Sequence, residues 1–248
     1  MVGATRSCGA IVVAAMLCIQ TVWAGEPSAD GLDHRAAVDA TSYPWSAVGA
    51  LFNGSRSECT AVAVAPDQAL TAAHCLFGQA TGRLMQPQSL HLLLGFVHGT
   101  YQVDALVQSY QLGAAYDHGR PIDTLQADWA LLKLTAPLPK DHPALALASV
   151  LPNPNTPVMT GGYGKDRAYM MTVDSRCRVR EVVVHGLLLN DCHAVHGYSG
   201  SPLLQPVVGT DRFEVVGLNV AISTAGGAPM TFSVPAVTIA RELGISAE

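Results

Sequence analysis

Short apolar runs separated by turn-forming residues dominate the first half of the chain. Runs of this kind, rich in β-branched and aromatic side chains and bounded by Gly, Pro, Asn or Asp, are typical of β-strands. The segments between them, such as Pro66-Asp67-Gln68, have the composition of turns. The pattern predicts a meander of antiparallel strands over residues 45–52, 59–65, 90–96, 101–107 and 129–134.

A proline-rich stretch over residues 136–157 interrupts this pattern. Proline has no N–H to donate to a neighbouring strand, so such a stretch does not lie inside a sheet. Pro235 begins a predicted helix that ends near residue 243, just before Gly244. Between these two features, strands are predicted at 158–163, 179–185, 202–205, 213–221 and 230–234. The chain therefore has two strand-rich halves and a closing helix.

Residues 1–24 have the pattern of a secretory signal peptide. Arg6 supplies the positive start, residues 10–19 the apolar stretch, and Val22-Trp23-Ala24 the cleavage site. The apolar stretch is too short to span a bilayer. We expect an exported protein, secreted or periplasmic, that has no membrane association once the signal is removed. Residues 25–42 would then form an N-terminal segment or pro-segment.

The charge balance narrows the choice of partner. The chain has 14 basic and 19 acidic side chains and a formal net charge of −5, which becomes one unit more negative when Arg6 leaves with the signal. A protein that binds nucleic acid needs basic side chains to neutralise phosphates. The composition therefore predicts no nucleic-acid partner.

Four of the six cysteines remain in the exported chain. They are Cys59, Cys75, Cys177 and Cys192. An even number of cysteines in an exported protein indicates disulfides, and four cysteines allow three pairings that sequence alone does not distinguish. A zinc site has little support because no Cys-x-x-Cys is present.

Three short motifs carry the candidate chemistry. They are Thr71-Ala72-Ala73-His74-Cys75, Asp128-Trp129-Ala130-Leu131-Leu132 and Gly197-Tyr198-Ser199-Gly200-Ser201-Pro202. A serine hydroxyl becomes a nucleophile when an imidazole takes its proton and a carboxylate orients that imidazole. The order His, Asp, Ser along the chain is that of chymotrypsin, not that of subtilisins or α/β-hydrolases. The motifs therefore predict a catalytic triad of His74, Asp128 and Ser199.

These motifs resemble those of the trypsin-like, chymotrypsin-fold serine peptidases. The Gly-x-Ser-Gly-Ser-Pro form is similar to that of the bacterial secreted branch that includes the glutamyl endopeptidases. The resemblance covers about residues 43–243 and implies an all-β fold of two antiparallel six-stranded β-barrels with a C-terminal helix. It places the N-terminal barrel at 43–137, an inter-barrel linker at 138–157, and the C-terminal barrel with its helix at 158–248.

The resemblance also implies roles for residues. His74 would be the general base, Asp128 its orienting carboxylate, and the N–H groups of Gly197 and Ser199 the oxyanion hole. It favours a disulfide between Cys59 and Cys75, which leaves Cys177 with Cys192. It implies a protein or peptide substrate, a monomer, and neither a cofactor nor a metal.

The chain departs from the trypsin pattern at three places. Tyr198 stands where trypsins have the Asp that pairs with a newly cut N-terminus, although Arg35-Ala36 offers a processing bond. His193 stands near the position of the Asp that selects basic P1 side chains, where it is either the floor of the pocket or a solvent-facing loop residue. Asn219 stands near the His with which glutamyl endopeptidases select acidic P1 side chains. We therefore predict neither trypsin-like nor acidic specificity.

The sequence predicts a secreted serine endopeptidase that forms an acyl-enzyme on Ser199. Two alternatives remain: a catalytically inactive binding protein of the same fold, since a fold does not fix a function, and an esterase. The complete set of triad residues favours the endopeptidase.

Overall fold

The computed structural model describes residues 33–53, 56–223 and 229–245, all of which belong to one unit that spans residues 32–248. The expected signal peptide lies outside the described residues. Within the described part, no helix has the length and apolar character that crossing a membrane requires.

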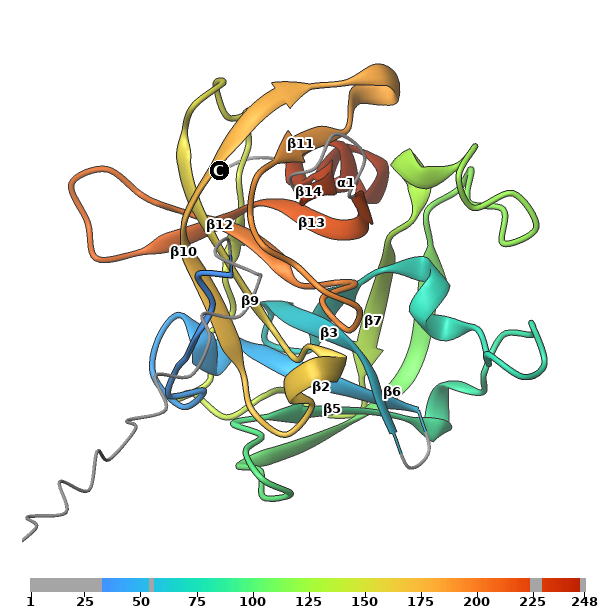
Figure 1. Ribbon diagram of the computed structural model, residues 1–248. Coiled ribbons are helices and arrows are strands. Elements are labelled where there is room, and N and C mark those ends of the chain that lie inside the picture. Colours follow the sequence, from blue (N-terminus) through green and yellow to red (C-terminus); the bar gives the residue numbers. More distant parts are fainter. Residues whose placement is uncertain (1–32, 54–55, 224–228, 246–248) are drawn as a thin grey trace, which may run out of the picture. The chain divides into compact units, whose positions relative to one another are not determined.

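The first barrel contains the strands of the first half of the chain. Its six antiparallel strands are β2 (Val48–Asn53), β3 (Arg56–Ala65), β4 (Gln68–Thr71), β5 (Leu90–Leu94), β6 (Val103–Leu112) and β7 (Ala130–Leu134), and they close in the order β2-β3-β4-β7-β6-β5 (Figure 1). In β7, buried residues alternate with partly exposed ones, as expected for a strand with one face on a core. The predicted run at 45–52 begins with a 3-10 helix, η1 (Trp45–Ala47), before β2.

The second barrel contains β9 (Pro157–Gly162), β10 (Thr172–Val182), β11 (Leu188–Asn190), β12 (Pro202–Pro206), β13 (Phe213–Ser223) and β14 (Met230–Pro235). They follow the order β10-β11-β14-β13-β12-β9, and the pairing of β9 with β10 closes the barrel (Figure 1). Helix α1 (Ala236–Leu243) follows directly and ends at Gly244 in the left-handed conformation, as predicted. The structure therefore confirms the two-barrel fold.

Two short strands add to the second barrel. β1 (Ala36–Ala37) pairs with β10, and β8 (Ala146–Leu147), inside the proline-rich stretch, pairs in parallel with β13. The remaining 3-10 helices are η2 (Ala73–Leu76), η3 (Pro87–Ser89), η4 (Leu125–Ala127), η5 (Lys165–Arg167) and η6 (Val184–Gly186). Several of these turns carry the residues that form the candidate site.

The prediction for residues 179–185 was wrong in its bounds. The strand β10 begins at Thr172 and ends at Val182, and the next residues turn into η6. Its middle contains Ser and Arg side chains that are exposed, alternating with buried Cys177 and Val179. Because the apolar run starts only at Val179, the hydrophobic pattern missed the first half of the strand.

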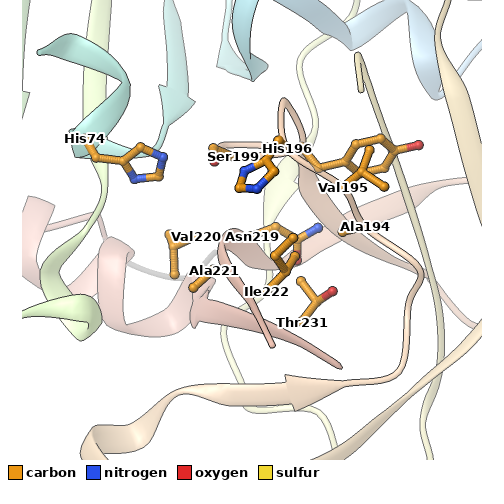
Figure 2. A pocket seen from close by; sticks show the side chains of 11 residues that line it. His74, Ala194, Val195, His196, Ser199, Asn219, Val220, Ala221, Ile222 and Thr231 are labelled. Atoms are coloured by element: carbon orange, nitrogen blue, oxygen red, sulfur yellow. The ribbon is translucent and has the colours of Figure 1, made fainter. Parts of the chain in front are cut away.

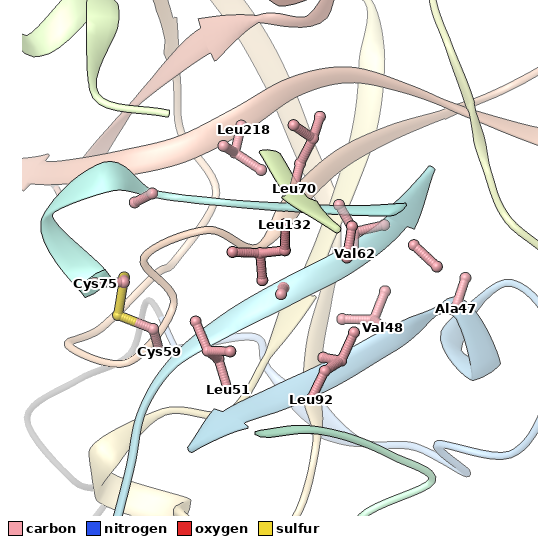
Figure 3. Packing of buried hydrophobic residues seen from close by; sticks show 14 of the residues in the cluster. Ala47, Val48, Leu51, Cys59, Val62, Leu70, Cys75, Leu92, Leu132 and Leu218 are labelled. Carbon is pink, nitrogen blue, oxygen red and sulfur yellow. A yellow bond between two sulfur atoms is a disulfide. The ribbon is translucent and has the colours of Figure 1, made fainter. Parts of the chain in front are cut away.

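The core of the first barrel consists of closely packed aliphatic side chains. Figure 3 shows Val48, Val62, Leu92 and Leu132 packed together, and each has 0% of its surface exposed. Leu218 of β13 belongs to the same buried cluster. The hydrophobic contacts therefore continue from one barrel into the other and hold the two barrels together.

Candidate active site

Strand pairing brings His74 and Asp128 together. β4 pairs with β7 such that Thr71 is opposite Ala130. The chain leaves β4 at Thr71 and enters β7 at Ala130, so the turn after one strand and the turn before the other lie at the same end of the barrel. His74 lies in the first turn, in η2, and Asp128 directly follows η4.

Asp128 holds His74 at two points. One carboxylate oxygen accepts the backbone N–H of His74 at 2.9 Å, and the other accepts its ring Nδ1–H at 2.7 Å. Only 2% of the Asp128 surface is exposed. Since Nδ1 donates to the carboxylate, Nε2 is left with its lone pair as a proton acceptor. The other acidic residues near β7 do not share this position: Asp117 bonds to Arg120 and Gly119.

The Ser199 loop depends on two glycines with positive φ. Gly197 has φ +102° and Gly200 has φ +80°. A Cβ at Gly200 would lie 2.3 Å from the carbonyl oxygen of Thr60, and one at Gly197 would lie 2.3 Å from that of Tyr163. Both positions therefore combine a left-handed backbone with close contact to a neighbouring main chain, which only glycine accommodates.

Thr60 of β3 fastens this loop to the first barrel. Its backbone N–H donates to the carbonyl of Ser199 at 2.9 Å, and its hydroxyl donates to the carbonyl of Gly197 at 2.9 Å. The same hydroxyl accepts the backbone N–H of Tyr163 at 3.0 Å. No motif distinguished Thr60 in the sequence, because its role comes from the contact between the barrels.

The peptide between His196 and Gly197 has a fixed orientation. The carbonyl of His196 accepts the backbone N–H of Lys165 at 2.7 Å. In a planar trans peptide the N–H points opposite to the carbonyl, so the Gly197 N–H points away from Lys165. Among the described residues, no acceptor takes the backbone N–H of Gly197 or of Ser199. Two neighbouring donors are thus available to a bound group.

A pocket of about 270 Å³ opens beside Ser199 (Figure 2). It is lined by His74, Ala194, Val195, His196, Tyr198, Ser199, Asn219, Val220, Ala221, Ile222 and Thr231. Figure 2 shows His74, Ser199 and His196 along the upper side of this group. The lining contains no Lys, Arg, Asp or Glu among the residues the structure describes.

Two polar side chains of the pocket, Asn219 and Thr231, form hydrogen bonds inside the protein. The Asn219 amide donates to Thr160 at 2.7 Å and to Ser201 at 2.9 Å, and its oxygen accepts the Ser233 hydroxyl at 2.6 Å. The Thr231 hydroxyl donates to the carbonyl of Cys192 at 2.9 Å. The pocket therefore presents mainly apolar surface to a ligand.

A second pocket of about 370 Å³ shares His74, His196 and Ser199 with the first. Its lining also contains Phe77 and His118, whose rings stack with centroids 3.9 Å apart. The two cavities extend from the same catalytic candidates. A ligand with an extended chain therefore has room in two places next to Ser199.

The two predicted pocket residues have different positions. Asn219 lines the pocket, whereas His193 is not part of the lining. The backbone N–H of His193 donates to Asp174 at 2.9 Å, and its buried Nδ1 has no hydrogen-bond partner among the described residues. Of the two positions expected for His193, the floor of this pocket is not the one that the structure gives it.

Tyr198, which stands where trypsins have an Asp before the nucleophile, is buried. Its hydroxyl donates to the carbonyl of Thr172 at 2.6 Å and accepts the Thr172 hydroxyl at 2.7 Å. Burial raises the pKa of the Tyr198 hydroxyl to about 12, so it is neutral at physiological pH. The guanidinium of Arg35 lies 5.7 Å from the centroid of its ring.

Arg35 was expected to mark a processing bond, but its position argues against cleavage in the folded protein. Only 2% of its side chain is exposed, and it forms ion pairs with Asp33 and Asp166. Its carbonyl accepts the Arg167 side chain at 3.3 Å, and Ala36 pairs with β10. A protease would have to detach this segment to reach the Arg35–Ala36 bond.

Two disulfides link the cysteines as the resemblance implied. Cys59 bonds to Cys75, next to His74, and Cys177 bonds to Cys192. The sulfurs of Cys59 and Cys75 and the ring of His74 lie close together, but oxidised sulfurs are not thiolate ligands for a metal. The first disulfide instead ties η2 to β3.

The family model for Trypsin matches residues 34–240 of this chain. The chain belongs to the trypsin family. It is a trypsin-like serine endopeptidase by this match. A structural comparison finds a Glu endopeptidase solved in complex with MPD, with a TM-score of 0.70, 18% sequence identity, and coverage of 88% of this chain and 99% of the other. That likeness supports the fold. A sequence comparison with curated proteins finds no match.

Proposed function

We propose that this trypsin-family protein is an exported endopeptidase in which His74, Asp128 and Ser199 form the catalytic triad. The observation that carries the proposal is the double hydrogen bond from His74 to buried Asp128, at the edge of a pocket that Ser199 shares. This arrangement sets the tautomer in which Nε2 accepts a proton. The family match supports the reaction class.

The proposed reaction has two halves. Ser199 Oγ attacks the carbonyl carbon of the peptide bond while its proton passes to Nε2 of His74, and His74 then gives that proton to the departing amine. The product is an ester on Ser199. Water attacks this ester with His74 again as the base, which releases the carboxylic acid and restores the serine.

The backbone N–H groups of Gly197 and Ser199 are the proposed oxyanion donors. The orientation of the His196–Gly197 peptide and the positive φ of Gly197 support this role. Such donors stabilise the negative oxygen of the tetrahedral intermediate, and one of them contributes about 2.7–4 kcal/mol in a comparable enzyme.

We further propose that the pocket of about 270 Å³ binds an uncharged, apolar P1 side chain. The Asn219 amide in its lining is occupied by internal hydrogen bonds, and its described lining has no Lys or Arg to pair with an acidic side chain, nor Asp or Glu to pair with a basic one. A buried charge without a partner is unfavourable. Peptides with Leu or Val at P1 should therefore be cut faster than otherwise identical peptides with Glu or Lys.

Export is proposed from the sequence of residues 1–24 and from the two disulfides, which persist in oxidising compartments. The substrate is a protein or peptide, and we expect a monomer that binds neither nucleic acid nor membrane. No cofactor is part of the proposed mechanism.

A fluorophosphonate probe tests the assignment of the nucleophile. The signal-free protein should be labelled, and mass spectrometry should place the adduct on Ser199. The Ser199→Ala variant should not react, whereas Ser109→Ala, which changes an exposed serine of β6, should react like the wild type. An adduct on another residue, or no adduct on folded protein, would contradict the proposal.

A further inference from the structure

The buried guanidinium of Arg35 joins the N-terminal segment to the loop that orients the candidate oxyanion donors. Its two terminal nitrogens donate to both carboxylate oxygens of Asp166, at 3.2 and 2.7 Å. On its other side the same guanidinium donates to Asp33. A planar guanidinium suits such paired contacts better than an ammonium group does.

Asp166 lies next to Lys165 in η5. Lys165 donates its backbone N–H to the carbonyl of His196 at 2.7 Å, and this bond sets the direction of the Gly197 N–H. Packing reinforces the link, because a Cβ on Gly164 would lie 2.5 Å from Asp166 and 2.6 Å from Val195. The chain of contacts therefore runs from Arg35 through η5 to the His196–Gly197 peptide.

A second line of contacts starts at the same segment. Ala37 pairs with Thr172 in the register of β1 and β10, and Thr172 holds the hydroxyl of Tyr198. The Arg35 guanidinium faces the Tyr198 ring, a cation–π arrangement that gains strength when it is desolvated. Tyr198 is the residue between Gly197 and Ser199, so the segment reaches the donor loop from two directions.

We propose that Arg35 is a positioning residue that keeps the Gly197 and Ser199 amides in the donor orientation, and that it does so as a side chain of an uncut N-terminal segment. The inference rests on the proposed function. It assigns to Arg35, Asp166 and Tyr198 the task of ordering the donor loop without a new chain terminus. Arg35 does not touch the substrate in this account.

The charges of the cluster agree with a formed ion pair. Hydrogen bonds from Arg35 hold the pKa of Asp33 well below its usual range. Burial raises the pKa of Asp166, but the hydrogen bonds and the positive charge of Arg35, together with the charge of Arg167, lower that pKa overall. Both carboxylates are therefore ionised at neutral pH and pair with the guanidinium.

The test compares Arg35→Met with Arg180→Met. Arg180 lies in β10 and, like Arg35, pairs with an aspartate, Asp191. About half of the Arg180 side chain is exposed, whereas that of Arg35 is buried. In Arg35→Met, kcat on a peptide substrate should fall about tenfold or more with little change in KM, because donors act on the transition state. Affinity for a peptide aldehyde, which forms a tetrahedral adduct, should fall in parallel. Arg180→Met should match the wild type, and Arg35→Lys should recover part of the loss.

Amide hydrogen exchange gives a reading that does not require activity. The Lys165 amide should exchange about tenfold faster in Arg35→Met, while the Thr60 amide, which donates to Ser199, should keep its rate. If Arg35→Met does not fold, Asp166→Asn removes the same link and leaves the pairing of Arg35 with Asp33.

The outcomes separate the two proposals. A wild-type protein without peptidase activity contradicts the proposed function, and the Lys165 exchange rate still decides the role of Arg35. Faster exchange in the folded variant supports the inference. Unchanged exchange with unchanged kcat, in folded Arg35→Met or Asp166→Asn, would overturn it.

Discussion

The backbone N–H of Thr60, in the first barrel, donates to the carbonyl of Ser199, in the second, at 2.9 Å. The Thr60 hydroxyl adds a bond to the carbonyl of Gly197 and accepts the N–H of Tyr163. One fully buried residue of the first barrel therefore holds the loop of the candidate nucleophile against that barrel.

Thr60→Val should destabilise the protein and slow the reaction. Valine keeps the shape and the backbone bond to Ser199 but leaves the Tyr163 N–H and the Gly197 carbonyl without a partner. An unsatisfied buried group costs about 1–3 kcal/mol, so the free energy of unfolding should fall by about 2–6 kcal/mol for the two groups together. Urea denaturation measures the loss, and kcat should fall with it. Thr135→Val, at an exposed site after β7, serves as the control. Equal stability of the two variants would show that the hydrogen bonds of the Thr60 hydroxyl do not stabilise the fold.

Asp128→Asn should reduce kcat about 10⁴-fold while the protein stays folded, because the amide no longer fixes the tautomer of His74. Asp117 supplies the control: its side chain is 44% exposed and bonds to Arg120, so Asp117→Asn should keep nearly full activity. Steady-state kinetics on one peptide measures both. Loss of activity in Asp117→Asn and not in Asp128→Asn would reverse the assignment.

The candidate triad could be predicted from the sequence because each member lies in a short contiguous motif. His74 precedes Cys75, Asp128 precedes the apolar run of β7, and Ser199 lies between two glycines. Most strands were predictable for a similar reason, since their apolar runs are local in sequence, whereas their arrangement in two barrels was implied by the family resemblance.

The roles of Thr60, Arg35 and Asp166 were not accessible in this way. Each depends on a partner more than a hundred residues away in sequence, and no local pattern reports such a contact. The sequence offered Arg35-Ala36 as a processing bond because Arg35 is a basic residue in the N-terminal segment. The burial of Arg35 follows from the pairing of β1 with β10. The strand β1 has only two residues, which is too short to show a hydrophobic period.

Gly200→Ala should be far more harmful than Gly209→Ala. The two glycines have nearly equal φ, +80° and +77°, so the backbone strain of an added side chain is the same. A Cβ at Gly209 meets nothing within 4 Å, but at Gly200 it lies 2.3 Å from the Thr60 carbonyl. Thermal unfolding should show a loss of about 1–2 kcal/mol for Gly209→Ala from the left-handed backbone and a clearly larger loss for Gly200→Ala. Similar losses would mean that the Ser199 loop can move away from β3.

The ion pair of Arg35 should make stability depend on acid pH. Asp33 has a lowered pKa in the folded protein because Arg35 donates hydrogen bonds to it. A lowered folded pKa contributes stability that is present above the unfolded value of about 3.9 and is lost as pH falls through the folded value. The difference in unfolding free energy between wild type and Arg35→Met should therefore be constant above about pH 5 and shrink toward pH 2. Urea titrations across this range measure it, and a difference that grows with acid would contradict the pairing.

The central claim is that Ser199 becomes acylated during peptide hydrolysis. The direct measurement is rapid acid quenching of the enzyme with a peptide or activated ester substrate, followed by mass spectrometry of the intact and digested protein. The account predicts a covalent adduct with the mass of the acyl fragment on Ser199, absent in Ser199→Ala and more abundant with an apolar P1 residue. Turnover of peptide by the Ser199→Ala variant, or an acyl group on a different residue, would contradict it.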